Sequence, residues 1–135
     1  MERLVFKHKL KNYYLIADAY NGKHIQYCTD QFLKSNAGQL KDTIHSEGKI
    51  LGINGNAKLL SYIGHDGLMD FTLENTYKNS DGKTRDCIIL ACISKRYFSP
   101  YIQNTKSNQN FTNFLSITRS SSAKYFAYRR NYSRS

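Results

Sequence analysis

The chain has 135 residues, which predicts one domain large enough to bury a hydrophobic core, and it carries a formal net charge of +10. No run of residues approaches the ~18 apolar residues that a membrane-spanning helix needs, and the start, Met1–Lys7, lacks the apolar region of a signal peptide. The three cysteines have neither metal-site nor disulfide-framework spacing. We therefore expect a cytoplasmic protein that uses no membrane, no metal and no organic cofactor.

The first 36 residues predict two strands and a helix. Leu4–Lys11 alternates roughly between apolar and charged residues and is either an edge strand or a lead-in to the next element, and Tyr13–Ala19 is rich in strand-forming residues. Asn21-Gly22 supplies a turn, and apolar residues then recur at three- and four-residue spacing over Lys23–Asn36, which predicts an amphipathic helix. A strand, a glycine turn and a helix would form the first half of a βαβ unit.

The rest of the chain predicts a parallel sheet. Residues 39–56 show no clear period, with a short strand expected at Lys49–Ile53 and a turn at Asn54-Gly55. Strands are expected at Lys58–Ile63 and at Cys87–Ile93, and the second run is unbroken, which is typical of a strand buried on both faces. A helix that begins close to Pro100 and a strand within residues 111–118 complete the domain. We therefore expect an α/β fold: a three-layer sandwich with a mostly parallel central sheet.

The positive charge is concentrated toward the C-terminus. Residues 1–86 carry 12 Lys and Arg and all 10 acids, whereas residues 87–135 carry 8 Lys and Arg and no acid. We expect residues 1–118 to form a single α/β domain and residues 119–135 to form a basic tail. With its five basic residues and three tyrosines, such a tail can follow phosphates and stack on bases. The simpler interpretation is a solvated chain end.

Two of the expected strands deliver a histidine and a cysteine. Lys58–Ile63 is followed by His65, and Cys92 lies where the later strand should end. Ligands bind at the carboxyl ends of parallel strands, and neighbouring strands lie about 5 Å apart. A histidine within hydrogen-bond reach activates a cysteine, which predicts His65 as general base and Cys92 as nucleophile. Backbone N–H groups at Gly67 and Cys92 are the expected oxyanion donors.

These residues also have structural interpretations. Cys28 is expected to be a core residue, and Cys87 is a further candidate for that role. A histidine between glycines can simply bond its own turn. Asp18, at the end of an expected strand, is either a pocket carboxylate that selects a basic side chain or the cap of the following turn. Asp66 and Ser94 are further candidates for a substrate pocket.

The apolar strand that ends in Gly64-His65 and the later strand that ends in Ala91-Cys92 resemble the pattern of the caspase–legumain–gingipain clan of cysteine peptidases. The resemblance implies a caspase-like α/β fold, a catalytic histidine at His65, a nucleophile at Cys92, and a peptide or protein substrate. Asp66 stands before Gly67, whereas that clan has glycine directly after the histidine. Whether the site is competent or degenerate therefore stays open.

The leading hypothesis is a cysteine endopeptidase-like hydrolase with a His/Cys dyad. One alternative is a non-catalytic α/β binding module whose acid-free C-terminal third contacts nucleic acid or another polyanion. Another is a flavodoxin-like domain that binds a small phosphorylated ligand around Asn21-Gly22 and Gly64–Gly67, although no glycine-rich phosphate loop has the needed spacing. The sequence sets no oligomeric state.

Overall fold

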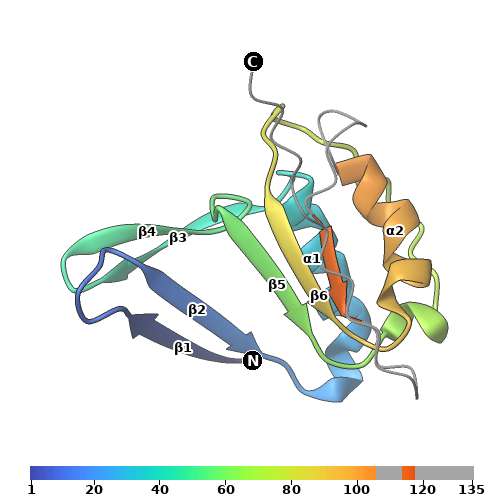
Figure 1. Cartoon of the computed structure of the whole chain (residues 1–135), viewed down its shortest axis with the longest axis horizontal. Helices are drawn as coiled ribbons and strands as arrows, with labels where there is room; N and C mark the ends of the chain where they lie inside the picture. The colour runs from blue at the N-terminus through green and yellow to red at the C-terminus, as the bar shows by residue number, and fades with distance from the viewer. Residues whose placement is uncertain (106–113, 118–135) are drawn as a thin grey trace, which may run out of the picture.

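The computed structural model describes residues 1–105 and 114–117 (Figure 1). Their elements, in chain order, are β1 (Glu2–Lys7), β2 (Tyr14–Ala19), the 3-10 helix η1 (Gly22–His24), α1 (Ile25–Asn36), β3 (Lys41–Ser46), β4 (Lys49–Asn54), β5 (Leu59–Ile63), the 3-10 helix η2 (Gly67–Met69), β6 (Asp86–Leu90), α2 (Ser94–Thr105) and β7 (Phe114–Ile117). The predicted basic tail, residues 119–135, lies outside the described residues.

The strands form three separate sheets. The central sheet has the order β5-β6-β7, and both of its strand pairs are parallel. The other two sheets are antiparallel hairpins, β1–β2 and β3–β4. Figure 1 shows both hairpins on the β5 side of the central sheet, away from β7.

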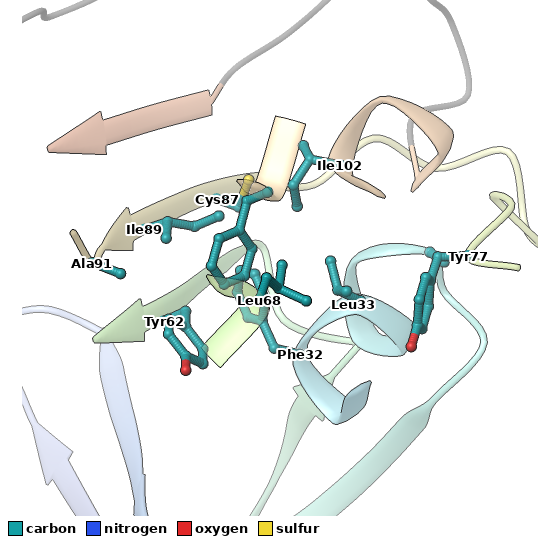
Figure 2. Packing of buried hydrophobic residues seen from close by; sticks show 11 residues of the cluster. Phe32, Leu33, Tyr62, Leu68, Tyr77, Cys87, Ile89, Ala91 and Ile102 are labelled. Atoms are coloured by element: carbon teal, nitrogen blue, oxygen red, sulfur yellow. The ribbon is translucent and has the colours of Figure 1, made fainter. Parts of the chain in front are cut away.

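Both helices pack against one face of the central sheet. Phe32 of α1 and Phe98 of α2 lie 5.6 and 5.2 Å, between ring centroids, from Tyr62 of β5, and 6.2 Å from each other. Aromatic rings at such separations attract one another beyond their burial of apolar area. The buried cluster around them is shown in Figure 2 and consists of Phe32, Leu33, Ala37, Tyr62, Leu68, Tyr77, Cys87, Ile89, Ala91, Phe98 and Ile102.

The opposite face of the central sheet carries no helix from the described residues. Leu59 and Ile63 of β5 are 51% and 73% exposed on it, and Ile88 and Leu90 of β6 are half-buried. The predicted three-layer sandwich with a mostly parallel sheet is therefore wrong. Both described helices cover the same face, and four of the seven described strands lie in antiparallel hairpins.

Local pairing explains where the predicted topology fails. The expected βαβ start does not form because β2 pairs antiparallel with β1, with Glu2 opposite Ala19. Residues 39–56 contain the β3–β4 hairpin, whose turn is Glu47-Gly48. The chain also turns at the expected Asn54-Gly55, where the Asn56 N–H donates to the Ile53 carbonyl at 3.0 Å, but this turn leads to β5 and closes no hairpin. Glu47 and Gly48 both have positive φ, 48° and 74°, which suits the right-handed twist of a two-residue hairpin.

The second helix also differs from the expectation. It runs from Ser94 to Thr105 with Pro100 in its interior, where a proline removes one helical hydrogen bond. Phe98 and Ile102 are fully buried on either side of this proline. Their burial in the core offsets the local cost, because packing of an apolar face contributes most of the stability of a short helix.

A buried ion pair joins the loop before β6 to the rest of the fold. Arg85 is 3% exposed, and its guanidinium donates to both carboxylate oxygens of Asp81, at 3.2 and 2.6 Å, and to the carbonyl of Gly55 at 2.6 Å. Lys41 Nζ lies 2.7 Å from the same carboxylate. The bonds from Arg85, followed by those from Lys41, hold the pKa of Asp81 well below its usual range.

We predict that Asp81→Asn lowers the free energy of unfolding by about 3–5 kcal/mol at pH 7, because it removes the negative charge that faces the buried Arg85 guanidinium. The pKa of Asp81 is lowered by folding, so its stabilising contribution is present above a pH of about 4 and is lost as the pH falls toward the folded value. Urea unfolding between about pH 2 and 7 measures both effects. Glu2→Gln, at an exposed position, is the control, and an equal pH dependence in both variants would contradict the prediction.

The two faces of the sheet should respond differently to truncation. Ile89→Ala opens a cavity under both helices and should cost about 2–5 kcal/mol, because Ile89 is fully buried. Ile63→Ala, on the face that no described helix covers, should change stability by no more than about 0.5 kcal/mol, because Ile63 is 73% exposed. Thermal and urea unfolding of the two variants measure the difference. A large loss in Ile63→Ala would show that this face is covered in solution.

Candidate functional site

The parallel pairing of β5 and β6 brings the histidine and cysteine segments to one edge of the sheet. Ile63 lies opposite Leu90 in register, and the pairing continues as Gly64 N–H donates to the Leu90 carbonyl at 3.2 Å. His65 lies two residues beyond the last paired residue of β5, and Cys92 lies two beyond that of β6. Figure 1 shows both segments leaving the central sheet at the carboxyl ends of these strands. The prediction that these two strands are parallel neighbours is confirmed.

Cys92 occupies the turn between β6 and α2. It is exposed, whereas Cys28 is half-buried against the core and Cys87 is buried, and no disulfide joins these cysteines in the described part of the chain. Ile93, the next residue, has φ +51°, which is uncommon for a β-branched side chain and costs about 1–2 kcal/mol. Helix α2 begins at Ser94, so Cys92 stands just before a helix N-terminus, which favours negative charge on nearby groups.

His65 lies in a loop that is fixed by backbone contacts. Its carbonyl accepts hydrogen bonds from the Tyr62 hydroxyl at 2.7 Å and from the Gly67 N–H at 3.1 Å. Its side chain is 58% exposed, and the ring Nε2 lies 2.7 Å from Oδ2 of Asp70. The His65 ring therefore bonds Asp70 and not Cys92 in the structure.

Asp70 was not among the residues that the sequence pointed to. It stands five positions after His65 in the chain, with no motif that links the two. Only the 3-10 helix η2 (Gly67–Met69) turns the chain back so that the two side chains meet. A single turn of this kind leaves no periodic signal in a sequence.

Asp66 has a structural role. It is fully buried, and its Oδ1 accepts a hydrogen bond from the Leu68 N–H at 3.1 Å, which caps η2. Its Oδ2 is buried with no hydrogen-bond partner among the described residues. Burial raises the pKa of the Asp66 carboxyl. The side chain therefore supports the His65 loop from inside. It does not line an open substrate pocket, which is the role that the sequence analysis assigns to it.

The glycine after Asp66 is required by close packing. A Cβ at Gly67 would stand 2.6 Å from the ring of Phe71, which is closer than real contacts allow. The Gly67 N–H is engaged by the His65 carbonyl and so is not available to an oxyanion in this structure. Of the two predicted oxyanion donors, the Cys92 N–H is then the one that remains.

The other predicted pocket residues are occupied elsewhere. Asp18 forms a two-pronged ion pair with Arg3, at 2.6 and 2.8 Å, across the β1–β2 hairpin, so it neither caps the following turn nor stands as an open pocket carboxylate. Ser94 is the first residue of α2 and is fully buried. The predicted pocket of Asp18, Asp66 and Ser94 therefore does not form in this structure.

An open groove lies between the N-terminal part of α1 and residues 72–75, which follow the His65 loop in the chain. It has a volume of about 730 Å³ and is lined by the start of α1 and by the segment that follows Asp70. Its lining residues carry charges of both signs and are Lys23, His24, Gln26, Tyr27, Asp30, Thr72, Leu73, Glu74 and Asn75. No sequence signal points to this groove, because its two walls come from segments about 50 residues apart.

The described residues contain no group of three or more His, Cys, Asp or Glu side chains that could hold a metal ion. Within the same part of the chain, neither helix has the length and apolar character needed to cross a membrane. Comparison of the chain with protein-family models, with curated proteins and with solved structures gives no match.

The burial of Asp66 yields a test of its role. Folding raises the pKa of this carboxyl, so the folded state loses stability relative to the unfolded chain as the pH rises above about 4. Asp66→Asn keeps an oxygen that can accept the Leu68 N–H and removes the group that titrates, so we expect the variant to lose this decline and to gain stability relative to the wild-type protein as the pH rises from 4 to 7. Thermal unfolding of the wild-type protein and of Asp66→Asn at pH 4 and pH 7 measures this difference in stability. Asp70→Asn, at an exposed site, should show no such gain.

Proposed function

We propose that this protein is a cysteine hydrolase of the peptidase type, with Cys92 as the nucleophile and His65 as the general base. The observation that supports the proposal is the in-register parallel pairing of β5 and β6, which sets an exposed histidine loop and an exposed cysteine turn at one sheet edge. Their order along the chain is that of the caspase–legumain–gingipain clan. The substrate is a peptide or protein.

The proposed reaction uses only groups at this edge. His65 accepts the proton of the Cys92 thiol, and the sulfur attacks the carbonyl carbon of the scissile amide to form a tetrahedral intermediate. The Cys92 amide and the start of α2 stabilise the oxyanion. The C–N bond then breaks, and the imidazolium gives its proton to the leaving amine. Water, deprotonated by His65, hydrolyses the resulting thioester and regenerates the thiol.

The three cysteines differ enough for a selective assay. Burial raises the pKa of the Cys28 thiol, and Cys87 lies in the core, so neither is a good nucleophile in the folded protein. Cys92 is the exposed one. A peptide-based thiol-reactive probe should therefore attach at Cys92 alone.

We predict that a peptide vinyl sulfone labels the folded protein once, at Cys92, as read by mass spectrometry of the intact and digested chain. Cys92→Ala should abolish labelling and Cys28→Ala should leave it unchanged, because Cys28 is half-buried against the core. His65→Ala should slow labelling by about 10²-fold or more, the usual contribution of a general base. Labelling that persists in Cys92→Ala, or an unchanged rate in His65→Ala, would contradict the proposal.

The polyanion-binding alternative rests on the acid-free segment 87–135. Six of its eight basic residues lie outside the described residues, and they are Lys106, Arg119, Lys124, Arg129, Arg130 and Arg134. Nothing in the described part of the chain favours this function over hydrolysis, so it stays a sequence-based prediction.

A further inference from the structure

We propose that Asp70 is the positioning residue of this site and that it sets the tautomer of His65. The catalytic role of Asp70 rests on the proposed function, whereas its contact with His65 is observed whatever the function is. The observation is the 2.7 Å contact between Oδ2 of Asp70 and Nε2 of His65. The strand-end pattern in the sequence points to His65 and Cys92 and assigns no role to Asp70.

The chemistry of the pair decides which ring nitrogen carries the proton. A carboxylate only accepts hydrogen bonds, so Nε2 of His65 must be the nitrogen that donates. In the neutral ring, the lone pair is then on Nδ1. The nitrogen that serves as base toward the Cys92 thiol is therefore Nδ1. An acid that holds the far side of an imidazole orients it and stabilises the imidazolium that forms during reaction.

The loop holds both partners in place from their backbones. The Asp70 N–H donates to the Gly67 carbonyl at 2.9 Å and closes η2, and the His65 carbonyl is held by the Tyr62 hydroxyl. The buried Asp66 side chain caps the same turn. The contact therefore joins two exposed side chains whose backbones are held by hydrogen bonds of the same turn.

The surroundings add one more charge to the pair. Asp66 interacts electrostatically with both His65 and Asp70, and it is the other acid on this loop. Helices α1 and α2 pack against η2. On α1, the charges of Lys34 and Asp30 are paired with each other at 2.8 Å. Any change in reactivity with pH must therefore be compared with a variant that alters Asp66.

A purely structural role and a positioning role of Asp70 predict different effects of its loss on stability, on the His65 tautomer and on the reactivity of Cys92. The His65 and Asp70 side chains are 58% and 66% exposed, and exposed ion pairs contribute little to stability. Loss of Asp70 should therefore leave the thermal unfolding midpoint almost unchanged. If Asp70 positions the ring, its loss changes the tautomer and the reactivity of Cys92 all the same.

The test uses Asp70→Asn in the full chain, with two readouts. The first is the tautomer of His65 from ¹⁵N chemical shifts near pH 8, where His65→Ala identifies the signals of this ring among the four histidines. In the wild-type protein the Nε2–H form should dominate. In Asp70→Asn the side-chain NH₂ can donate to Nε2, so the Nδ1–H form should become a major species.

The second readout is the pH profile of Cys92 alkylation by iodoacetamide. We expect Asp70→Asn to lower the rate near pH 7 by about 10- to 100-fold and to move the midpoint of the profile. Asp70→Glu should restore most of the rate because it returns a carboxylate. Glu74→Gln, on the same loop segment, and Asp66→Asn are the matched controls and should keep the wild-type tautomer.

The outcomes separate this inference from the proposed function. An unchanged tautomer in Asp70→Asn overturns the inference even where the peptide probe labels Cys92. A changed tautomer together with a wild-type protein that the peptide probe does not label supports the positioning role and contradicts the peptidase proposal. A fall in unfolding temperature with an unchanged tautomer shows a purely structural pair and also overturns the inference.

Discussion

The register between β5 and β6 is the constraint on which the candidate site depends. The two parallel strands are paired in register from Leu59–Asp86 to Ile63–Leu90, so the segments that follow Ile63 and Leu90 leave from the same edge of the sheet. A slip of either strand by one residue would turn its buried side chain, Tyr62 of β5 or Ile89 of β6, away from the helices. Burial of these two side chains therefore holds the register, and with it the common sheet edge from which the segments of His65 and Cys92 leave.

The covered face of the sheet supports this register. Phe32 and Phe98, from the two helices, meet over Tyr62, whose hydroxyl reaches the carbonyl of His65. One tyrosine thus joins the aromatic core to the loop of the candidate base. The buried Arg85–Asp81 pair performs a comparable task at the other end of β6, where it ties the incoming loop to the carbonyl of Gly55.

Two aspartates and one glycine that follow His65 in the chain have distinct physical roles. Asp66 is buried and caps the turn, Gly67 leaves room for Phe71, and Asp70 reaches the imidazole from the surface. The aspartate that departs from the clan's glycine pattern thus supports the loop from within. The Gly67 amide is used by that same loop, which leaves the turn at Cys92 as the source of backbone donors.

The sequence alone determined the elements whose signals are local. The spacing of apolar residues indicated α1, and the short apolar runs indicated β5 and β6 and the placement of His65 and Cys92 beyond them. Tertiary structure decided the rest. An unbroken run such as Cys87–Leu90 does not say how many of its faces a helix will cover, and Tyr14–Ala19 does not reveal that its partner is β1. The pairing of His65 with Asp70 likewise needed the turn of η2, because contacts made by one turn of chain depend on its packing and leave no repeat in the sequence.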